Sequence, residues 1–256
     1  MTNDKQDAER KAHFDEHGYV SLPGFLTPDE VADLNRHIDT FIADVVPTMP
    51  RERVFYEDVD DPSTLKQLLR LFEFDETFHK MAFNSRYERL AELLLGEAVT
   101  VENMQWFNKP PKAGKPSPAH QDGYYFMLKP NHALTFWIAL EDVDEETGCV
   151  RYVDRSHKWG MRAHGSTGTL GFSQGILDYG IDNDLQNEIA FPCKAGHLLA
   201  HHSLTIHRSD GNRSETRTRR ALGFMYSATS AVRMNEEAYL AYQKQLAEDM
   251  AAKGKL

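Results

Sequence analysis

Apolar residues in the first third of the chain recur at the spacing of a helix. The sequence Thr27-Pro28-Asp29-Glu30 precedes the first stripe. A threonine followed three residues later by glutamate forms a capping box, and proline is favoured at the first helical position. The pattern therefore predicts a helix after Thr27. Its apolar stripe consists of Val31, Leu34, Ile38, Phe41, Ile42 and Val45.

Two more helices are predicted before residue 98. Ser85 and Glu88 form a second capping box ahead of a leucine-rich run, and Gly96 is a suitable C-terminal stop. The segment 63–82 is a third helix candidate. We expect all three helices to support the fold.

From Ala98 the pattern changes to short runs rich in β-branched and aromatic residues. Glycine, proline, asparagine and aspartate separate these runs, which is typical of strands and their turns. The chain returns to helix after Asn235, which is a suitable cap, with acidic residues in the first turn and lysines at the end. The predicted strands are 98–107, 122–128, 133–141, 149–153, 196–202 and 221–228.

Helices followed by several short strands indicate an α+β, mainly β fold. The architecture that fits is a double-stranded β-helix, the jelly-roll or cupin-like core, with N-terminal and C-terminal helices packed outside it. A length of 256 residues suits one domain with a sizeable core. We expect one domain over 1–256, with helical support over about 1–97, the β-core over about 98–230 and a C-terminal helix over about 235–252.

Charge and composition narrow the choice of partners. The chain has 39 acidic and 29 basic residues, a formal charge of −10, which disfavours nucleic acid and anionic membranes as partners. No apolar run approaches the length of a membrane span, and the start is polar and charged through Phe14. Cys149 and Cys193 are too few for a disulfide framework, so we expect two buried thiols. These features predict a cytoplasmic protein in which any anionic ligand meets a local basic cluster.

The spacing His-x-Asp occurs three times, and chance alone gives roughly one such pair in a chain of this composition. Side chains two residues apart point in different directions on a helix but share one face of a strand. Only a pair on extended chain can therefore grip one ion. The three pairs are His13/Asp15, His37/Asp39 and His120/Asp122.

The third pair has the right setting. His37 and Asp39 lie inside the capped helix, and His13 and Asp15 lie in a charged segment that we expect to be helical. Prolines at 116 and 118 oppose a helix immediately before His120. One imidazole and one carboxylate fill two corners of an octahedron, and a second histidine completes the facial triad typical of oxygen-activating Fe(II).

The second histidine should come from a distant strand. Four histidines compete within 197–207, and spacing does not choose among them. An arginine-rich run follows the last of them. This run is either a solvated loop or the place where an arginine binds a dicarboxylate cosubstrate in a bidentate manner. The four candidates are His197, His201, His202 and His207.

Several ordered segments resemble the phytanoyl-CoA dioxygenase family of Fe(II)/2-oxoglutarate-dependent oxygenases. The likeness runs from Phe14 to about Tyr226. A departure occurs at Asp154-Arg155-Ser156, where the family usually has Pro-Gly before Ser-His. The matching segments are 14–31, 108–111 (NKPP), 120–122 (HQD), 137–140 (WIAL), Gly148-Cys149, 156–158 (SHK) and 207–222.

The resemblance implies a site and an activity. It implies that His120, Asp122 and His207 bind Fe(II) and that Arg219 holds 2-oxoglutarate, with Arg217 as a rival. The expected reaction hydroxylates an unactivated C–H of a small organic substrate with O2, releasing succinate and CO2, with ascorbate as a candidate reductant. An aspartate at 122 argues against a halogenase. Further positions that the resemblance assigns to cosubstrate binding are Gln105, Trp137, Lys109 and His202.

Other questions stay open at this stage. The alternatives are a non-oxidative cupin-type metalloenzyme, such as an isomerase or hydrolase, which would not need Arg219, and a catalytically silent 2-oxoglutarate-binding module. An acid or an acyl thioester is a candidate substrate, because Lys109, Lys112 and Lys115 form a basic segment, although a solvated loop also explains them. The segment 161–190 is a candidate lid. We expect a monomer or weak homo-oligomer and assign no role to His164 or His201.

Overall fold

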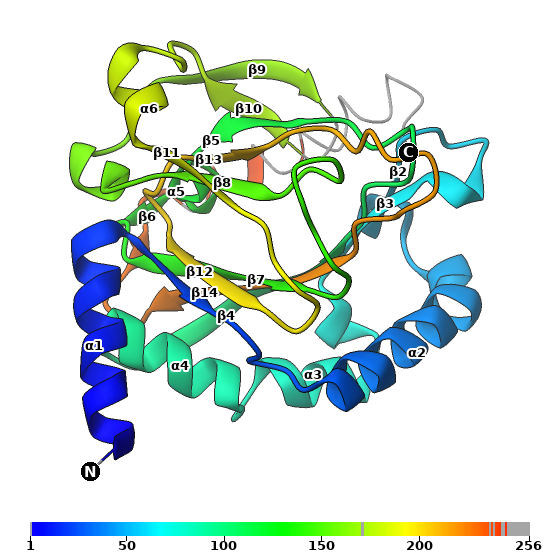
Figure 1. Ribbon diagram of the computed structural model, residues 1–256, viewed down its shortest axis with the longest axis horizontal. Coiled ribbons are helices and arrows are strands. Elements are labelled where there is room, and N and C mark those ends of the chain that lie inside the picture. The colour runs from blue at the N-terminus through cyan, green and yellow to red at the C-terminus, as the bar shows by residue number, and fades with distance from the viewer. Residues whose placement is uncertain (1, 170–171, 236, 238, 242–243, 245–256) are drawn as a thin grey trace.

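Two antiparallel β-sheets face each other at the centre of the molecule (Figure 1). The computed structural model describes residues 2–169, 172–235, 237, 239–241 and 244. The larger sheet has seven strands in the order β1-β12-β7-β14-β4-β3-β2. Its strands are β1 (Tyr19–Leu22), β2 (Val54–Tyr56), β3 (Leu65–Leu69), β4 (Val99–Phe107), β7 (Ala133–Ala139), β12 (Leu198–His202) and β14 (Ala221–Ala228).

The smaller sheet lies opposite and has the order β11-β8-β13-β5. Two short two-stranded ribbons complete the β-structure, one pairing β9 with β10 and the other β6 with β15. The predicted jelly-roll, cupin-like core is confirmed. The remaining strands are β5 (Ser117–His120), β8 (Val150–Val153), β11 (Glu188–Phe191), β13 (His207–Ser209), β6 (Leu128–Lys129), β9 (His164–Thr169), β10 (Phe172–Ile176) and β15 (Val232–Arg233).

Helices α2, α3 and α4 lie along the outer face of the larger sheet, and α1 packs at its side (Figure 1). The side chains of Val31, Leu34, Ile38 and Phe41 are buried in the core that these helices share with the sheet. The helices are α1 (Thr2–His17), α2 (Pro28–Asp44), α3 (Glu76–Ala82), α4 (Arg86–Leu95), α5 (Asp122–Phe126) and α6 (Asp182–Asn187), with 3-10 turns η1 (Val46–Thr48), η2 (Arg51–Arg53), η3 (Pro62–Thr64), η4 (Leu71–Glu73) and η5 (Ser156–Trp159).

The predicted helix boundaries at α2 and α4 are confirmed. Thr27 and Glu30 form the reciprocal capping box at the start of α2. Ser85 caps α4 by accepting hydrogen bonds from the backbone N–H groups of residues 87 and 88. Gly96 ends α4 with a left-handed φ of 79°, a conformation that suits glycine.

The prediction of one helix over 63–82 is wrong for its first half. Residues Leu65–Leu69 form β3, which pairs with β4 on one side and β2 on the other. Only Glu76–Ala82 is helical, capped by the side chain of Asp75. Short apolar runs fit either period, and here pairing with two strands decides the outcome.

The predicted strand over 122–128 is also wrong. Residues Asp122–Phe126 form the short helix α5, and only Leu128 and Lys129 are extended, as β6. The aromatic residues suggested a strand. Tertiary contacts favour the helical turn: the N–H of Gly123 donates to the carbonyl of Ser203, and the Tyr125 hydroxyl bonds the backbone of Gln174.

The other predicted strands appear as β4, β7, β8, β12 and β14. The candidate lid at 161–190 contains β9, β10, α6 and most of β11, and its mobility stays a prediction. Most of the predicted C-terminal helix lies outside the described residues. Both cysteines are buried free thiols, as expected. Among the described helices, none combines the length and the apolar character needed to cross a membrane.

Candidate metal centre

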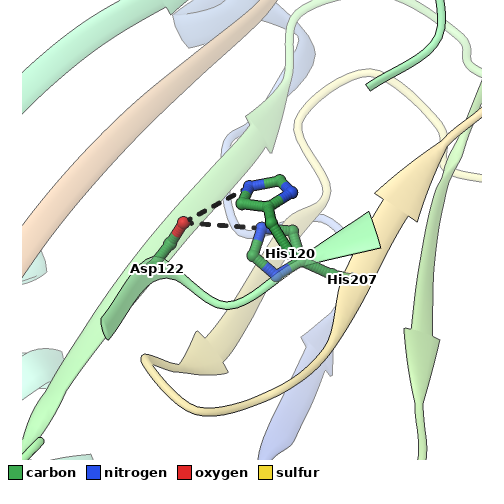
Figure 2. A group of neighbouring side chains, drawn as sticks. All are labelled: His120, Asp122 and His207. Carbon is green, nitrogen blue, oxygen red and sulfur yellow. Dashed lines mark ion pairs between the residues drawn. The ribbon is translucent and has the colours of Figure 1, made fainter. Parts of the chain in front are cut away.

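Three side chains converge between the two sheets because their elements are neighbours. His120 ends β5 and His207 begins β13, and the two residues are direct cross-strand partners. Gln121 is extended, with φ −124° and ψ 125°, so Asp122 at the start of α5 points back toward the histidines. Figure 2 shows both imidazoles directed at one oxygen of the carboxylate. The His-x-Asp spacing thus brings both side chains together because the middle residue is extended and a helical turn follows it.

The distances suit a common ligand. Nε2 of His120 and Nε2 of His207 each lie 3.6 Å from Oδ1 of Asp122. The three candidate ligand atoms lie within 4.8 Å of one another. The Nδ1 atoms bond to backbone carbonyls of Pro118 and Thr205, at 2.7 and 3.0 Å. Because a carbonyl can only accept, Nδ1 carries the proton and each Nε2 presents its lone pair to the centre.

Burial and neighbouring charges set the protonation of this group. Burial raises the pKa of Asp122, but its contacts with His207, His120 and His201 outweigh it and hold the pKa well below its usual value. Burial, followed by the charges of His120 and His201, lowers the pKa of His207 well below its usual value. An ionised carboxylate beside neutral imidazoles is the state in which these groups bind a metal.

Arg219 is the second distinctive feature of the site. Its side chain is buried, with 4% of the residue exposed, and the guanidinium carbon lies 5.5 Å from the ring centroid of Trp137. Its Nε has no hydrogen-bond partner, and among the described residues no carboxylate forms an ion pair with it. Burial lowers the pKa of Arg219 to about 10. A buried cation without a counter-ion is costly, which indicates an anionic ligand.

The rival arginine lies elsewhere. Arg217 is half-exposed and forms ion pairs with Asp144, at 2.8 Å, and with Glu146. It does not contribute to the wall of the cavity that contains the three converging side chains. Arg219 does.

The other predicted cosubstrate residues divide into two groups. Gln105, Trp137 and Lys109 line the same cavity as Arg219. The Lys109 ammonium donates to the backbone carbonyls of Lys115 and Asp210, both at 2.7 Å, so it also braces two loops. Burial is the main cause that lowers the pKa of Lys109 well below its usual value.

The structure does not bring His202 to the cavity. It lies on the opposite side of β12 from His201 and packs among the rings of Phe14, His132 and His157. His164 also lies outside the wall of the cavity, where its Nε2 accepts from the backbone N–H of Gln121.

The cavity has a volume of about 260 Å³, and His120, Asp122 and His207 form part of its wall. Sequence reasoning missed several of its wall residues. Thr135 could have been predicted from the strand pattern, since it shares a face of β7 with Trp137 two residues later. Gln67 and Ser209 could not have been, because β3 was expected to be helical and β13 was not predicted. The wall residues that were missed include Gln67, Thr135 and Ser209, and His201 was considered only as a competing metal ligand.

The wall is strongly basic although the chain as a whole is acidic. Among the described residues, it carries eight lysine or arginine side chains and three carboxylates, one of which is Asp122. Six of the eight cations are ion-paired, whereas Lys109 and Arg219 form no ion pair among the described residues, so an anion is favoured beside these two. The local basic cluster that an anionic ligand requires is therefore present.

Comparisons with known proteins agree with this geometry. The family model described as phytanoyl-CoA dioxygenase matches residues 14–221. The chain belongs to the phytanoyl-CoA dioxygenase family. It is 21% identical over 228 residues to the mouse peroxisomal phytanoyl-CoA dioxygenase, covering 84% of this chain and 67% of the mouse protein. It is 27% identical over 253 residues to the bovine phytanoyl-CoA dioxygenase domain-containing protein 1, covering 82% and 86%.

A solved structure extends the comparison to the fold. The epimerase SnoN, in complex with Fe3+, alpha-ketoglutarate and nogalamycin RO, aligns with a TM-score of 0.73 at 22% identity, covering 91% of this chain and 87% of SnoN. The predicted family and enzyme class are confirmed: this is an iron- and 2-oxoglutarate-dependent oxygenase. The converging histidines and aspartate suit the iron of that class.

Proposed function

We propose that this member of the family hydroxylates a C–H bond of a small anionic organic substrate, with Fe(II) held by His120, Asp122 and His207 and 2-oxoglutarate held by Arg219. The observation that carries the proposal is the pairing of two features in one cavity. A three-residue metal site lies at one part of its wall, and a buried arginine without a counter-ion lies at another. Hydrolysis or isomerisation by a metal alone would leave Arg219 unexplained.

Each residue then has a physical task. Arg219 would take the distal carboxylate of 2-oxoglutarate, which would relieve the cost of burying an unpaired cation. Trp137 supports the guanidinium from one face. When bound, iron and 2-oxoglutarate supply the oxidising chemistry, with release of succinate and CO2. The protein orients the reactants and excludes water from a largely buried site.

Size and charge support a small acid as the substrate. A cavity of about 260 Å³ lies just below the range of roughly 300–1,000 Å³ for drug-sized ligands, and it must hold 2-oxoglutarate as well. Arg53 and Arg70 are wall residues about one third exposed, and both pair with the single carboxylate of Glu73. A net positive charge therefore remains where the wall reaches solvent. We assign the substrate's anionic group to this pair, whether it is the carboxylate of a free acid or a charged group on the carrier of an acyl thioester.

Substrate-stimulated succinate release tests the proposal. Small carboxylic acids, their neutral amides, amines and acyl thioesters would be compared at saturating Fe(II) and 2-oxoglutarate. We expect acids to stimulate succinate release and their amides to fail, and Arg70→Ala to raise the KM of the acid about tenfold, in line with the loss of a charge-assisted contact. Stimulation by neutral compounds alone would contradict the anionic substrate.

The same assay separates the alternatives. A silent binding module would bind 2-oxoglutarate and release no succinate with any substrate. A non-oxidative metalloenzyme would work without 2-oxoglutarate and would tolerate loss of Arg219. Mass analysis of the product decides whether the substrate gains an oxygen atom. A cytoplasmic location and a monomer or weak homo-oligomer stay predictions, and the mouse relative is named as peroxisomal.

A further inference from the structure

A second layer of polar residues surrounds Asp122. Its Oδ1 is the atom nearest to His120 and His207, whereas Oδ2 accepts hydrogen bonds from two other groups. These are the Thr135 hydroxyl, at 2.5 Å, and Nε2 of His201, at 3.1 Å. The two oxygens of one carboxylate thus have different partners.

The register of the larger sheet creates this arrangement. His201 on β12 and Thr135 on β7 are direct cross-strand partners, so they present two donors side by side to one oxygen. His201 is 3% exposed, so its hydrogen-bond partners come from the protein. Its other ring nitrogen, Nδ1, lies 3.0 Å from the hydroxyl of Tyr152.

Tyr152 comes from the opposite sheet. It lies on β8, where it is the cross-strand partner of His207. Its ring is fully buried, stacks on Tyr19 at 5.3 Å between centroids and contacts Phe191 at 5.2 Å. This packing fixes the position of the hydroxyl against His201.

The hydrogen bonds determine where the protons lie. An ionised carboxylate only accepts, so Nε2 of His201 must carry a proton. In a neutral imidazole Nδ1 is then an acceptor, and the hydroxyl of Tyr152 must donate to it. The chain of donation runs from Tyr152 through His201 to Oδ2 of Asp122.

We propose that His201, held as its Nε2–H tautomer by Tyr152, is a positioning residue that restricts Asp122 to binding iron through Oδ1 alone. This inference rests on the proposed iron site. A carboxylate that bound through both oxygens would take one of the three positions that the facial triad leaves open. His201 acts through Asp122 and is not itself a ligand: it contacts the oxygen that is not shared with His120 and His207, and it lies outside the group of three whose ligand atoms converge.

Anaerobic Fe(II) titrations of the full chain and its variants test this hydrogen-bond relay, which runs from Tyr152 through His201 to Oδ2 of Asp122. We expect H201F to weaken Fe(II) binding about 10–100-fold, as loss of such outer contacts commonly does. H201Q keeps an N–H donor and should bind Fe(II) within a few-fold of the wild type. Y152F removes the donor that fixes the tautomer of His201. It should weaken Fe(II) binding about tenfold or less.

A double variant gives the sharpest result. If Tyr152 acts only through His201, then Y152F adds no further loss of Fe(II) affinity in the H201F background. Additive losses would overturn the relay, and so would an unchanged affinity of H201F. If H201Q loses as much as H201F, an N–H donor at this position does not hold Asp122 and the proposal is wrong.

A matched control separates a loss of protein stability from a loss of Fe(II) affinity. Tyr226 is also fully buried, and its hydroxyl donates to the carbonyl of Ala82 at 2.9 Å, away from the iron site. Y226F should lower the thermal stability of the metal-free protein about as much as Y152F and leave Fe(II) affinity unchanged. Failure of the wild type to bind Fe(II) would instead overturn the proposed function, and the relay with it.

Discussion

At the scale of the residue, the site depends on how hydrogen bonds orient its side chains. The Nδ1 atoms of His120 and His207 and Oδ2 of Asp122 have hydrogen-bond partners in the protein, so Nε2 of each histidine faces Oδ1 of Asp122 across 3.6 Å. Arg219 is buried with its Nε unpaired. The proposal places the metal among the three facing atoms and the distal carboxylate of the cosubstrate at Arg219.

Replacing Arg219 tests two things: how much its buried charge destabilises the fold, and whether it binds 2-oxoglutarate. At 2-oxoglutarate concentrations of 100 times the Kd, we expect the wild type, with Fe(II) and without oxygen, to gain about 2.7 kcal/mol of stability. Arg219→Met should lose nearly all of this gain. The unliganded variant should unfold at the same or a higher temperature, since a buried unpaired charge is removed. Differential scanning calorimetry measures both.

Arg217→Met is the matched control. Its side chain is half-exposed and paired with surface carboxylates, so the gain from 2-oxoglutarate should persist. If the Arg217 variant lost the gain and the Arg219 variant kept it, the assignment of the cosubstrate arginine would be wrong.

At this scale the His-x-Asp pair in its extended setting and the resemblance to the family located the site together, since neither the pattern nor the spacing alone selected His207 or Arg219. His120, Asp122, His207 and Arg219 were predicted, and the structure brings all four to one cavity. His201 was seen only as one of four competing histidines. Its contact with Asp122 spans 79 residues of sequence, and it depends on a register between β7 and β12 that no local pattern specifies.

At the scale of the element, the smaller sheet holds the site together. β13 pairs with β5 on one side, which places His120 and His207 opposite each other, and with β8 on the other, which carries Tyr152. The turn that precedes β8 approaches the loop after β13 closely. Gly148 has a φ of 84°, and a Cβ there would lie 2.3 Å from the backbone oxygen of Asp210.

Gly148→Ala should therefore be strongly destabilising. It combines left-handed backbone strain with a clash against backbone, and we expect a loss of about 2–4 kcal/mol in the free energy of unfolding. Gly24→Ala is the matched control: its φ is 64°, but nothing lies within 4 Å of the added Cβ. It should lose only about 1 kcal/mol, the cost of the left-handed backbone alone. Urea unfolding of both variants measures the difference, and equal losses would contradict the proposed close contact.

Elements with a strong local signal were predictable, and elements formed by pairing were not. The capped helices after Thr27 and Ser85 were correct, because their caps are local. β3 was expected to be helical, and α5 was expected to be a strand. Both are five residues long, and contacts with distant strands or loops decide their conformation.

At the scale of the whole molecule, the main feature is a basic cavity inside an acidic chain. A second feature is the number of histidines kept neutral by burial. His202 packs among other rings beside α1, and burial, followed by the charges of His157, His132 and His201, lowers its pKa to about 3. Its value in the unfolded chain is about 6.5.

This difference predicts an acid-sensitive fold. Between about pH 6.5 and pH 3 the unfolded chain binds a proton at His202 and the folded protein does not, so stability falls as the pH falls. His202→Asn keeps an acceptor for the N–H of Leu204 and removes the titration. From pH 7 to pH 5 the wild type should lose about 2 kcal/mol more than this variant in urea unfolding. Parallel pH profiles would show that His202 does not stay neutral in the fold.

The central claim is that one cavity holds Fe(II) on three side chains and 2-oxoglutarate on Arg219. Anaerobic absorption spectroscopy tests it most directly, because 2-oxoglutarate chelated to Fe(II) gives a weak visible charge-transfer band that neither component gives alone. We predict this band in the wild type and in Arg217→Met. We predict its loss in Asp122→Ala and, at the same 2-oxoglutarate concentration, in Arg219→Met. A wild-type protein without the band at saturating Fe(II) and 2-oxoglutarate would contradict the account.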